Sequence, residues 1–198
     1  MAESDGCWPT TDPAYVAYHD EEWGRPVVDE RGLYERLCLE GFQSGLSWLT
    51  ILRKREAFRR AFASFDPDVV AGYTEDDIER LLADDAIVRH RGKIEATITN
   101  ARATQALRAT GSPLHELLWA HAPAARPAPK SHADWLSTTP ESEQLAKVLR
   151  QAGFRFIGPT TLHAAMQACG VVNDHLFNCI VRDDVEAVRS SFERSYPS

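Results

Sequence analysis

Residues 81–94 of this chain read Leu81-Leu82-Ala83-Asp84-Asp85-Ala86-Ile87-Val88-Arg89-His90-Arg91-Gly92-Lys93-Ile94. Before the polar middle of this stretch, Ile78, Leu81 and Leu82 recur at helical spacing, and after it Ile94 and Ile98 do the same. The pattern predicts a helix, a tight basic turn that ends in Gly92-Lys93, and a second helix. Backbone amides at the start of such a second helix can hold a phosphate group.

The rest of the sequence extends this helical pattern. Leu145, Val148 and Leu149 mark a further apolar stripe, and Pro140 suits the first turn of a helix that Thr139 would cap. No segment alternates apolar and polar residues over a convincing length, and no internal repeat is found. The sequence therefore predicts an all-α fold.

The size and composition of the chain fit one compact domain, or one domain with a small satellite. It has 198 residues, of which 43% are hydrophobic and 26% are charged. The proline-rich segment 122–129 cannot continue a helix and is expected to be an exposed connection. No apolar run approaches the roughly 18 residues that span a membrane, and the acidic segment 1–5 has no apolar stretch typical of a secretory signal. We expect a soluble, cytoplasmic protein.

The net charge of the chain and its local basic segments favour different conclusions about nucleic-acid binding. A net charge of −7 is unusual for a protein that binds nucleic acid, because such proteins usually carry a basic surface. Basic residues nevertheless gather in segments 53–60 and 89–93. The first of these segments is equally typical of a solvated helix face, so charge alone does not decide the question.

Two cysteines and two histidines near the chain ends form a candidate metal site: Cys7, His19, His175 and Cys179. His175 and Cys179 are four residues apart, so on a helix they would share one face. Two thiolates and two imidazoles make a closed tetrahedral set suited to structural zinc, which would fasten the two chain ends together. A single pair at this spacing is common, and the spacing by itself leaves open that these residues are ordinary core side chains.

Glu40 stands where an apolar residue is expected. Leu33, Leu37 and Glu40 follow helical spacing, and Gly41 and Gly45 come next, which predicts that the helix weakens or turns there. Burying a carboxylate is costly unless it is paired or hydrogen-bonded. Glu40 is therefore either satisfied by neighbouring amides or an arginine, or it is a recognition or catalytic group that faces a pocket.

Several aromatic residues accompany Glu40 in the sequence: Tyr15, Tyr18, Trp23 and Trp48. Each of them alone is as typical of a core as of a binding site. A carboxylate beside several aromatic rings would suit a flat, cationic heterocycle, because the rings stack on it and the carboxylate accepts its hydrogen bonds.

Four motifs, in this order, resemble the 3-methyladenine DNA glycosylase I family of helix-hairpin-helix glycosylases: Asp12-Pro13-Ala14-Tyr15-Val16-Ala17-Tyr18-His19-Asp20-Glu21-Glu22-Trp23-Gly24, Leu39-Glu40-Gly41-Phe42-Gln43-Ser44-Gly45-Leu46-Ser47-Trp48, Arg89-His90-Arg91-Gly92-Lys93-Ile94 and Met166-Gln167-Ala168-Cys169-Gly170-Val171-Val172-Asn173-Asp174-His175. The resemblance covers nearly the whole chain. It implies one glycosylase unit over residues 1–198, with a helix-hairpin-helix core over residues 26–165. Residues 1–25 and 166–198 would form a small zinc-clipped lobe that joins the termini.

The resemblance also implies a role for each matching position. Glu40, the candidate catalytic residue, would contact the extruded base, and Tyr15, Tyr18, Trp23 and Trp48 would shape its pocket. Leu46 would approach the gap left in the duplex. The turn would bind DNA through Arg89, His90, Arg91, Gly92 and Lys93, with Lys93 as a phosphate contact rather than a Schiff-base nucleophile. One structural zinc ion would be held by Cys7, His19, His175 and Cys179.

Three features depart from the family pattern. Trp8 follows Cys7 directly, where the family has a spacer. His163 and Ala165 occupy positions where bulkier aromatic residues are usual, so the preferred base could differ if these positions line the pocket. The negative net charge is consistent with modest affinity for DNA.

The function that the resemblance implies is hydrolysis of the N-glycosidic bond of 3-methyladenine in alkylated double-stranded DNA. A monomeric, monofunctional enzyme would release free 3-methyladenine and leave an abasic site. Three alternatives remain at this point: a glycosylase for a different alkylated base, a non-catalytic binder of damaged DNA or modified bases, and a zinc hydrolase. The last needs an open coordination position, which four protein ligands do not leave.

Overall fold

The computed structural model describes residues 7–193, and within this range all regular structure is helical. The elements are α1 (Pro13–Glu21), α2 (Glu30–Gln43), α3 (Trp48–Ala61), η1 (Ala63–Phe65), α4 (Pro67–Val70), α5 (Glu75–Ala83), α6 (Arg91–Ala109), α7 (Leu114–Ala120), η2 (His132–Asp134), α8 (Pro140–Gln151), α9 (Pro159–Ala168) and α10 (Arg182–Glu193). The all-α prediction is confirmed. None of these helices is long and apolar enough to cross a membrane. The acidic segment 1–5 lies outside the described residues.

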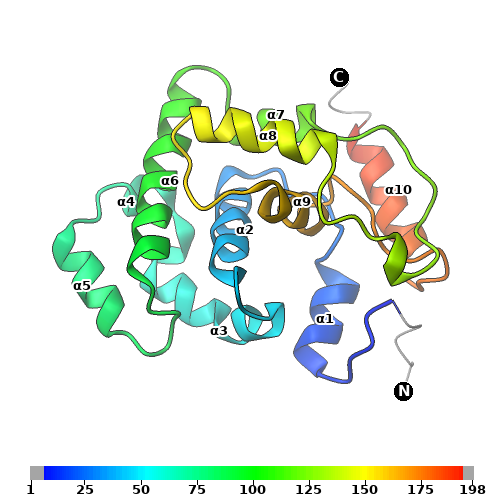
Figure 1. Ribbon diagram of the computed structural model, residues 1–198, viewed down its shortest axis with the longest axis horizontal. Coiled ribbons are helices and arrows are strands. Elements are labelled where there is room, and N and C mark those ends of the chain that lie inside the picture. The colour runs from blue at the N-terminus through cyan, green and yellow to red at the C-terminus, as the bar shows by residue number, and fades with distance from the viewer. Residues whose placement is uncertain (1–6, 194–198) are drawn as a thin grey trace.

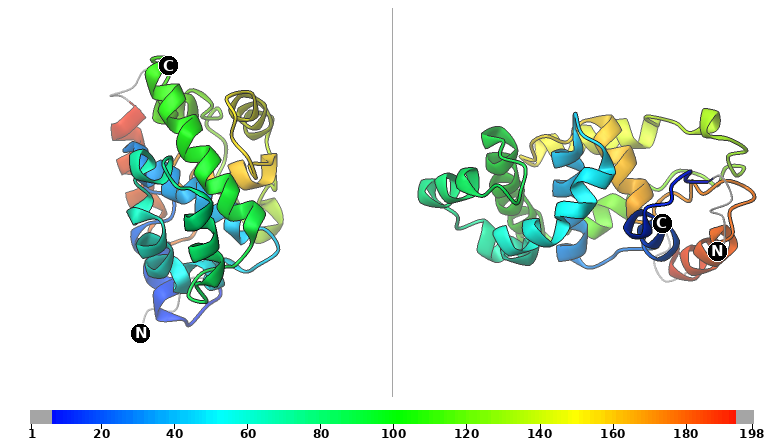
Figure 2. Two further views of the ribbon diagram at one scale, coloured as in Figure 1. Left: turned by 90° about the vertical axis from the view of Figure 1, so that its left-hand side faces the viewer. Right: turned by 90° about the horizontal axis from the view of Figure 1, so that it is seen from below.

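Helix α2 lies in the middle of the molecule and organises the packing around it (Figure 1). It contacts α3 and α6 towards one end of the molecule and α9 towards the other, and α8 in turn packs on α9. Helices α1 and α10, which come from opposite ends of the sequence, lie at the same end of the molecule in Figures 1 and 2. The first and last described helices therefore lie on one side of the central helix.

The predicted helical hairpin is formed by α5, the turn of residues 84–90, and α6. Helix α6 begins at Arg91, because Nδ1 of His90 accepts a hydrogen bond from the Lys93 amide at 3.2 Å and so caps the helix. Gly92 and Lys93 therefore lie in the first helical turn rather than in the loop. The predicted helix after Thr139 is also present as α8, with the Thr139 hydroxyl capping it.

The end of α2 differs from the expectation for its two glycines. Gly41 does not end the helix, which continues to Gln43. Only Gly45, with φ of +83°, turns the chain. The resulting short loop leads to Ser47, whose hydroxyl caps α3 by accepting from the Thr50 amide. Glu40 is therefore placed in the last turn of a continuous helix, next to the loop that carries Leu46.

Candidate active site and metal cluster

Glu40 is a buried carboxyl group without a protein partner. It is 7% exposed, and no other described residue reaches its side chain with a hydrogen bond or an ion pair. Burial raises the pKa of Glu40 from 4.5 to about 8, and the charge of Arg36 offsets only part of this effect. Of the two sequence-based alternatives, the structure favours a carboxyl group that is kept available for a ligand.

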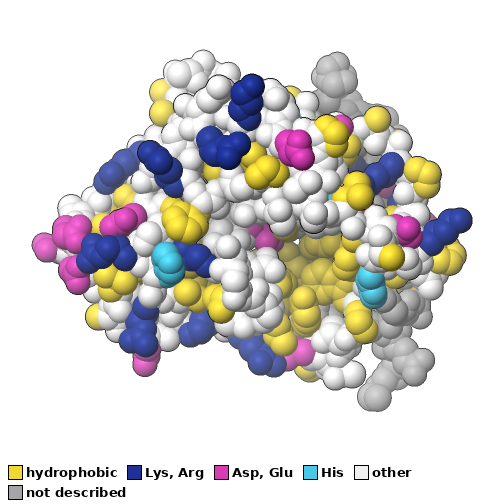
Figure 3. All heavy atoms as spheres, in the orientation of Figure 1, with side chains coloured by type: hydrophobic (Ala, Val, Ile, Leu, Met, Phe, Trp, Pro, Cys, Tyr) yellow, Lys and Arg dark blue, Asp and Glu magenta, His cyan; other side chains and the backbone are white. Residues whose placement is uncertain are grey.

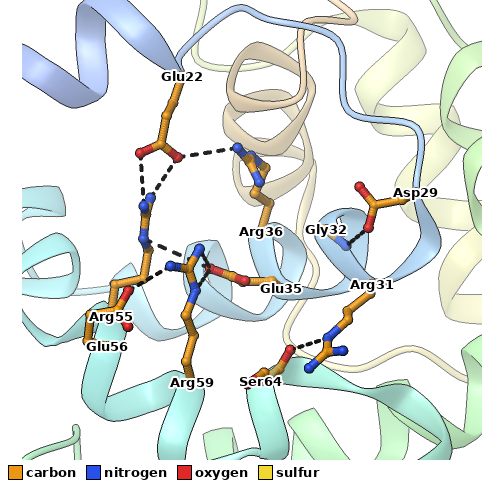
Figure 4. Close-up of polar contacts among 10 residues, drawn as sticks. All are labelled: Glu22, Asp29, Arg31, Gly32, Glu35, Arg36, Arg55, Glu56, Arg59 and Ser64. Atoms are coloured by element: carbon orange, nitrogen blue, oxygen red, sulfur yellow. Dashed lines mark hydrogen bonds and ion pairs between the residues drawn. The ribbon is translucent and has the colours of Figure 1, made fainter.

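Arg36, one helical turn before Glu40, is directed to a different carboxylate. Its Nη2 lies 3.5 Å from Glu22 Oε2, and Arg55 donates two hydrogen bonds of 2.8 Å to the same glutamate (Figure 4). Next to them, Arg59 pairs with Glu35 at 2.7 Å. This network fixes the end of α1 against α2 and α3, and it holds the Arg36 guanidinium at Glu22 rather than in an ion pair with Glu40.

Aromatic residues gather around Glu40. The rings of Tyr18 and Trp48 are 5.2 Å apart. The pKa values of Tyr15 and Tyr18 are raised, first by burial and then by the charge of Glu40, which places both hydroxyl groups within reach of its field. Among the described residues, nothing accepts a hydrogen bond from the buried Nε1 of Trp48. The site therefore combines stacking surfaces with an available carboxyl group and an available N–H donor.

The space-filling view shows a hollow on this side of the molecule, lined by hydrophobic side chains (Figure 3). Comparison with Figure 1 places it between α1, α9, and the end of α2 with its loop to α3. These are the elements that carry Glu40 and the aromatic residues around it. An open hollow lined by hydrophobic side chains suits a flat ligand.

Trp8 joins this aromatic group, and the sequence interpretation does not include it there. Its ring lies 4.6 Å from Tyr15 in an edge-to-face arrangement and 5.9 Å from Tyr18. Trp23 packs against the Cys/His cluster, with its ring 5.0 Å from Trp8 and 4.6 Å from His175. Trp8 directly follows Cys7 in the sequence, and this is the signal that could have identified it. A residue next to a candidate metal ligand is held close to the Cys/His cluster, and His19 of this cluster lies on the same helix as Tyr15 and Tyr18.

The four candidate metal ligands come together, as the sequence predicts. One ligand atom from each of Cys7, His19, His175 and Cys179 lies within 4.8 Å of every other, and all four residues are buried. His175 Nδ1 is 3.1 Å from His19 Nε2 and 3.3 Å from Cys179 Sγ, and Cys179 Sγ is 3.6 Å from His19 Nε2. The edges of a tetrahedral zinc site are about 3.3–3.8 Å, given its bond lengths. The donor set and its spacing therefore fit a tetrahedral metal ion.

Neighbouring groups orient both imidazoles of this cluster for metal binding. His175 Nε2 donates to the Trp23 carbonyl at 3.0 Å, so its Nδ1 lone pair faces the cluster. His19 Nδ1 donates to Asp20 at 2.7 Å, so its Nε2 is the free ligand atom. The Leu176 amide also donates to Cys7 Sγ at 3.3 Å. Such outer partners fix the tautomer of metal-binding histidines, which supports the metal interpretation.

The structure corrects the sequence interpretation of Lys93, a basic residue of the hairpin. Lys93 is buried, and its ammonium group donates to the carbonyls of Phe42 at 2.9 Å and Ser44 at 2.6 Å. A cation is favourable there because the C-terminus of α2 carries unpaired carbonyls and negative dipole charge. Lys93 is thus a structural residue, not a free phosphate contact.

Arg91 is exposed, but it pairs with acidic residues of the hairpin: Glu75, Glu79 and Glu95. Arg89 is exposed, and no ion pair to it is formed within residues 7–193. Leu46 is 41% exposed in the loop after α2, consistent with a residue that contacts a partner. Of Arg89, Arg91 and Lys93, Arg89 is therefore the one that neither an acidic side chain nor a backbone carbonyl of residues 7–193 engages, and its contact with DNA stays a prediction.

Comparison with known proteins decides the family. A family model described as methyladenine glycosylase matches residues 8–183. The chain belongs to this family. It is 46% identical over 175 residues to DNA-3-methyladenine glycosylase 1 of Escherichia coli (strain K12), covering 87% of this chain and 93% of that protein. It is 41% identical to DNA-3-methyladenine glycosylase of Haemophilus influenzae, covering 87% and 94%.

Solved structures of methyladenine glycosylases share the fold. A crystal structure of 3-methyladenine DNA glycosylase I superimposes with a TM-score of 0.84 at 46% identity, covering 87% of this chain and 96% of that one. A structure that describes 3-methyladenine recognition by the Staphylococcus aureus enzyme has a TM-score of 0.86 at 35% identity, covering 92% and 98%. A variant solved in complex with 3-methyladenine has a TM-score of 0.86 at 34% identity, covering 91% and 98%.

The two unusual residues of this methyladenine glycosylase, His163 and Ala165, are fully buried on α9. His163 Nε2 lies 3.7 Å from Asp174, whose pKa is lowered by His163, Gln167 and Arg126 against the effect of burial. The charged partner of His163 is therefore a structural aspartate next to the metal cluster. An effect of these residues on base preference stays a prediction.

Another hollow, with a volume of about 690 Å³, lies between segment 122–126 and α10. It is lined by residues such as Trp119, Arg126 and Val172, and it contains neither Glu40 nor any aromatic residue of the group around it. The chemistry of Glu40 and its neighbours, rather than the size of the hollow, identifies the candidate site of the glycosylase.

The structural role of Lys93 leads to a first prediction. We expect Lys93→Met to lower the free energy of unfolding of the glycosylase by about 1–3 kcal/mol, because it leaves two carbonyls at the end of α2 without their donor. Denaturant unfolding measures this change. Lys147→Met, which removes an exposed ammonium from α8, is the matched control and should change stability little. Equal stability of the two variants would contradict the role of Lys93.

Proposed function

We propose that this protein hydrolyses the N-glycosidic bond of 3-methyladenine in alkylated double-stranded DNA, releasing the free base and leaving an abasic site. The observation that carries the proposal is Glu40, a buried and unpartnered carboxyl group among stacked aromatic rings. The proposal is supported by the names of its relatives, which are 3-methyladenine glycosylases, one of them solved with 3-methyladenine.

The chemistry of the lesion explains why such a site is sufficient. Methylation at N3 leaves the base positively charged, so the glycosidic bond is already weak and the base is a good leaving group. Extruding a poorly paired, damaged base is also cheaper than extruding a normal one. The ionised Glu40 carboxylate accepts hydrogen bonds from the cationic base, while Tyr18 and Trp48 offer faces on which it stacks.

Hydrolysis then needs no covalent intermediate. Water attacks C1′ as the C1′–N bond breaks. The electron pair of that bond leaves with the base and neutralises its charge, and the attacking water releases one proton to the solvent as it becomes the hydroxyl group on C1′. Lys93, the lysine of the hairpin, does not supply a nucleophilic amine, because its ammonium group is buried and donates to two carbonyls. The enzyme is therefore monofunctional.

We further propose that the Cys/His cluster holds one structural zinc ion. Zinc would be bound by Cys7, His19, His175 and Cys179, and the ion would supply cross-linking of the chain ends rather than an activated water, since four protein ligands leave no open position. The helical hairpin would bind the DNA backbone through Arg89 and the amides at the start of α6, with Leu46 filling the gap left by the extruded base.

Base release tests the proposal directly. Purified protein is incubated with methylated duplex DNA, and the released bases are identified by chromatography. We expect 3-methyladenine, with strands that stay intact until alkali treatment and with no covalent adduct after borohydride reduction. If saturating protein binds the DNA but releases no base, the protein is a non-catalytic binder of damaged DNA and the proposed glycosylase activity is wrong. A borohydride-trapped adduct would contradict the monofunctional mechanism.

A further inference from the structure

Phe156 has an unusual backbone conformation and an exposed ring. Its φ of +54° lies in the left-handed region, which is unfavourable for a bulky residue. Phe65 also has a positive φ, but its ring is fully buried, so core packing offsets the cost. The ring of Phe156 is 48% exposed, and packing within the chain does not explain why a strained backbone holds it there.

The conformation of Phe156 is imposed by its neighbours. The buried side chain of Asn100 on α6 clamps the preceding residue, since its Oδ1 accepts from the Arg155 amide at 2.7 Å and its Nδ2 donates to the Arg155 carbonyl at 3.1 Å. Phe154 and Ile157 on either side are both buried. The backbone on both sides of Phe156 is therefore anchored, and its ring between these anchors is left half-exposed.

Phe156 lies between the hairpin and the candidate active site. Its ring is 6.0 Å from His90, the capping residue of α6, in an edge-to-face arrangement, and it borders Gly92. Its carbonyl oxygen approaches Gly41, the residue that follows Glu40 in α2. The loop that carries it, between α8 and α9, is seen in Figure 1. Arg89 and Arg155, both exposed, lie next to His90 and Phe156 in the chain.

We propose that Phe156 is a DNA-stacking residue, whose ring packs on the face of a base close to the extruded nucleotide. This proposal rests on the proposed function, because it assumes a duplex held at the hairpin. Extrusion leaves neighbouring bases without a stacking partner, and any base offers a π-face to an aromatic ring. A rigid exposed ring flanked by cationic side chains supplies such a partner at little cost in conformational entropy.

The test uses a short fluorescein-labelled duplex that contains a tetrahydrofuran abasic-site analogue, with affinity measured by anisotropy. We expect Phe156→Gly to weaken binding by at least about fivefold, the effect of losing one stacked base, and Phe156→Tyr to retain it. Glycine adopts the left-handed backbone without the steric cost that a side chain adds, so the melting temperature of Phe156→Gly should not fall. The matched control is Val69→Ala, which truncates another exposed hydrophobic residue, on α4, and should bind like the wild type.

Two further measurements separate this inference from the proposed function. Binding of free 3-methyladenine should be the same in all variants, because Phe156 acts on DNA and not on the base in the pocket. If the wild type releases 3-methyladenine and Phe156→Gly binds the duplex equally well, the stacking role is wrong and the glycosylase stands. If Phe156→Gly loses free-base binding and thermal stability together with DNA binding, Phe156 is structural and the inference is overturned. If the wild type releases no base but Phe156→Gly still binds the duplex more weakly than the wild type, the stacking role of Phe156 stands and the proposed glycosylase activity is wrong.

Discussion

Glu40→Gln should lower kcat/KM for release of 3-methyladenine from DNA by about 10- to 100-fold. A hydrogen bond to a charged group contributes about 1.5–3 kcal/mol, and each 1.4 kcal/mol corresponds to about a factor of ten in rate. The substitution keeps the size of the side chain but removes the negative charge that faces the cationic base. Single-turnover base release at subsaturating protein measures the change.

The pH dependence of the same reaction gives a second measurement on Glu40. Because the pKa of Glu40 in the free protein is about 8, the ionised form is a minor fraction at pH 6 and dominates above pH 8. The value of kcat/KM, which reports on the free enzyme, should rise with pH up to about 8 and then level off. Glu40→Gln should show no such rise. A wild-type profile without a rise between pH 6 and 8 would show that the charge of Glu40 is not used.

As pH rises, the contribution of Glu40 to the free energy of unfolding should fall, whereas kcat/KM should rise. The folded-state pKa of Glu40 is raised above its ordinary value of 4.5, so its contribution to stability is fully present below pH 4.5 and is lost as pH rises through 8. Glu40→Gln should therefore match the wild type at pH 4.5 and exceed it by about 2–5 kcal/mol at pH 9. Denaturant unfolding at the two pH values tests this. A variant with a pH-independent difference from the wild type would contradict a buried, titrating carboxyl group.

Helical spacing explains why much of the fold and of the metal cluster could be predicted from the sequence. His175 and Cys179 share a face because they are four residues apart, and Glu40 is recognised because it interrupts an apolar stripe. Residue type and the family resemblance add Cys7 and His19 to the predicted metal site, and the structure brings all four residues together. These predictions succeed because each depends on a local pattern or on a motif.

The failures all depend on contacts between distant elements. Lys93 belongs to the first turn of α6 and binds carbonyls at the end of α2, about fifty residues earlier, which no local pattern reveals. Trp8 packs edge-to-face on Tyr15, and Cys7 beside it meets His175 and Cys179 from the other end of the sequence. Gly41 stays helical although glycine has a low helix propensity, and the Phe156 carbonyl, from a distant part of the chain, lies next to it. Tertiary contacts decide these positions, and propensity does not.

Cys179→Ser should remove the bound zinc and lower the melting temperature by about 10 °C or more. A metal ion that binds only the folded state adds its binding free energy to stability, and about 1 kcal/mol corresponds to roughly 2–4 °C in a chain of this size. Zinc per chain is measured by elemental analysis and stability by calorimetry. Cys38→Ala, which removes a buried thiol of the core outside the cluster, is the control and should keep one zinc per chain.

The metal cluster should also affect the base-binding site, because the two share structural supports. Trp8 follows Cys7, the Trp23 carbonyl accepts from His175, and the Trp8 ring packs on both Trp23 and Tyr15, so the candidate metal ligands help to position Trp8 beside the proposed base site. Affinity for free 3-methyladenine should therefore fall in Cys179→Ser but not in Cys38→Ala, and a chelator should lower the melting temperature of the wild type without changing that of Cys179→Ser. A metal-free wild type that is equally stable would reject the zinc site. If zinc-free Cys179→Ser stays folded and binds the base with unchanged affinity, zinc connects the two ends of the described chain but has no influence on the base-binding site.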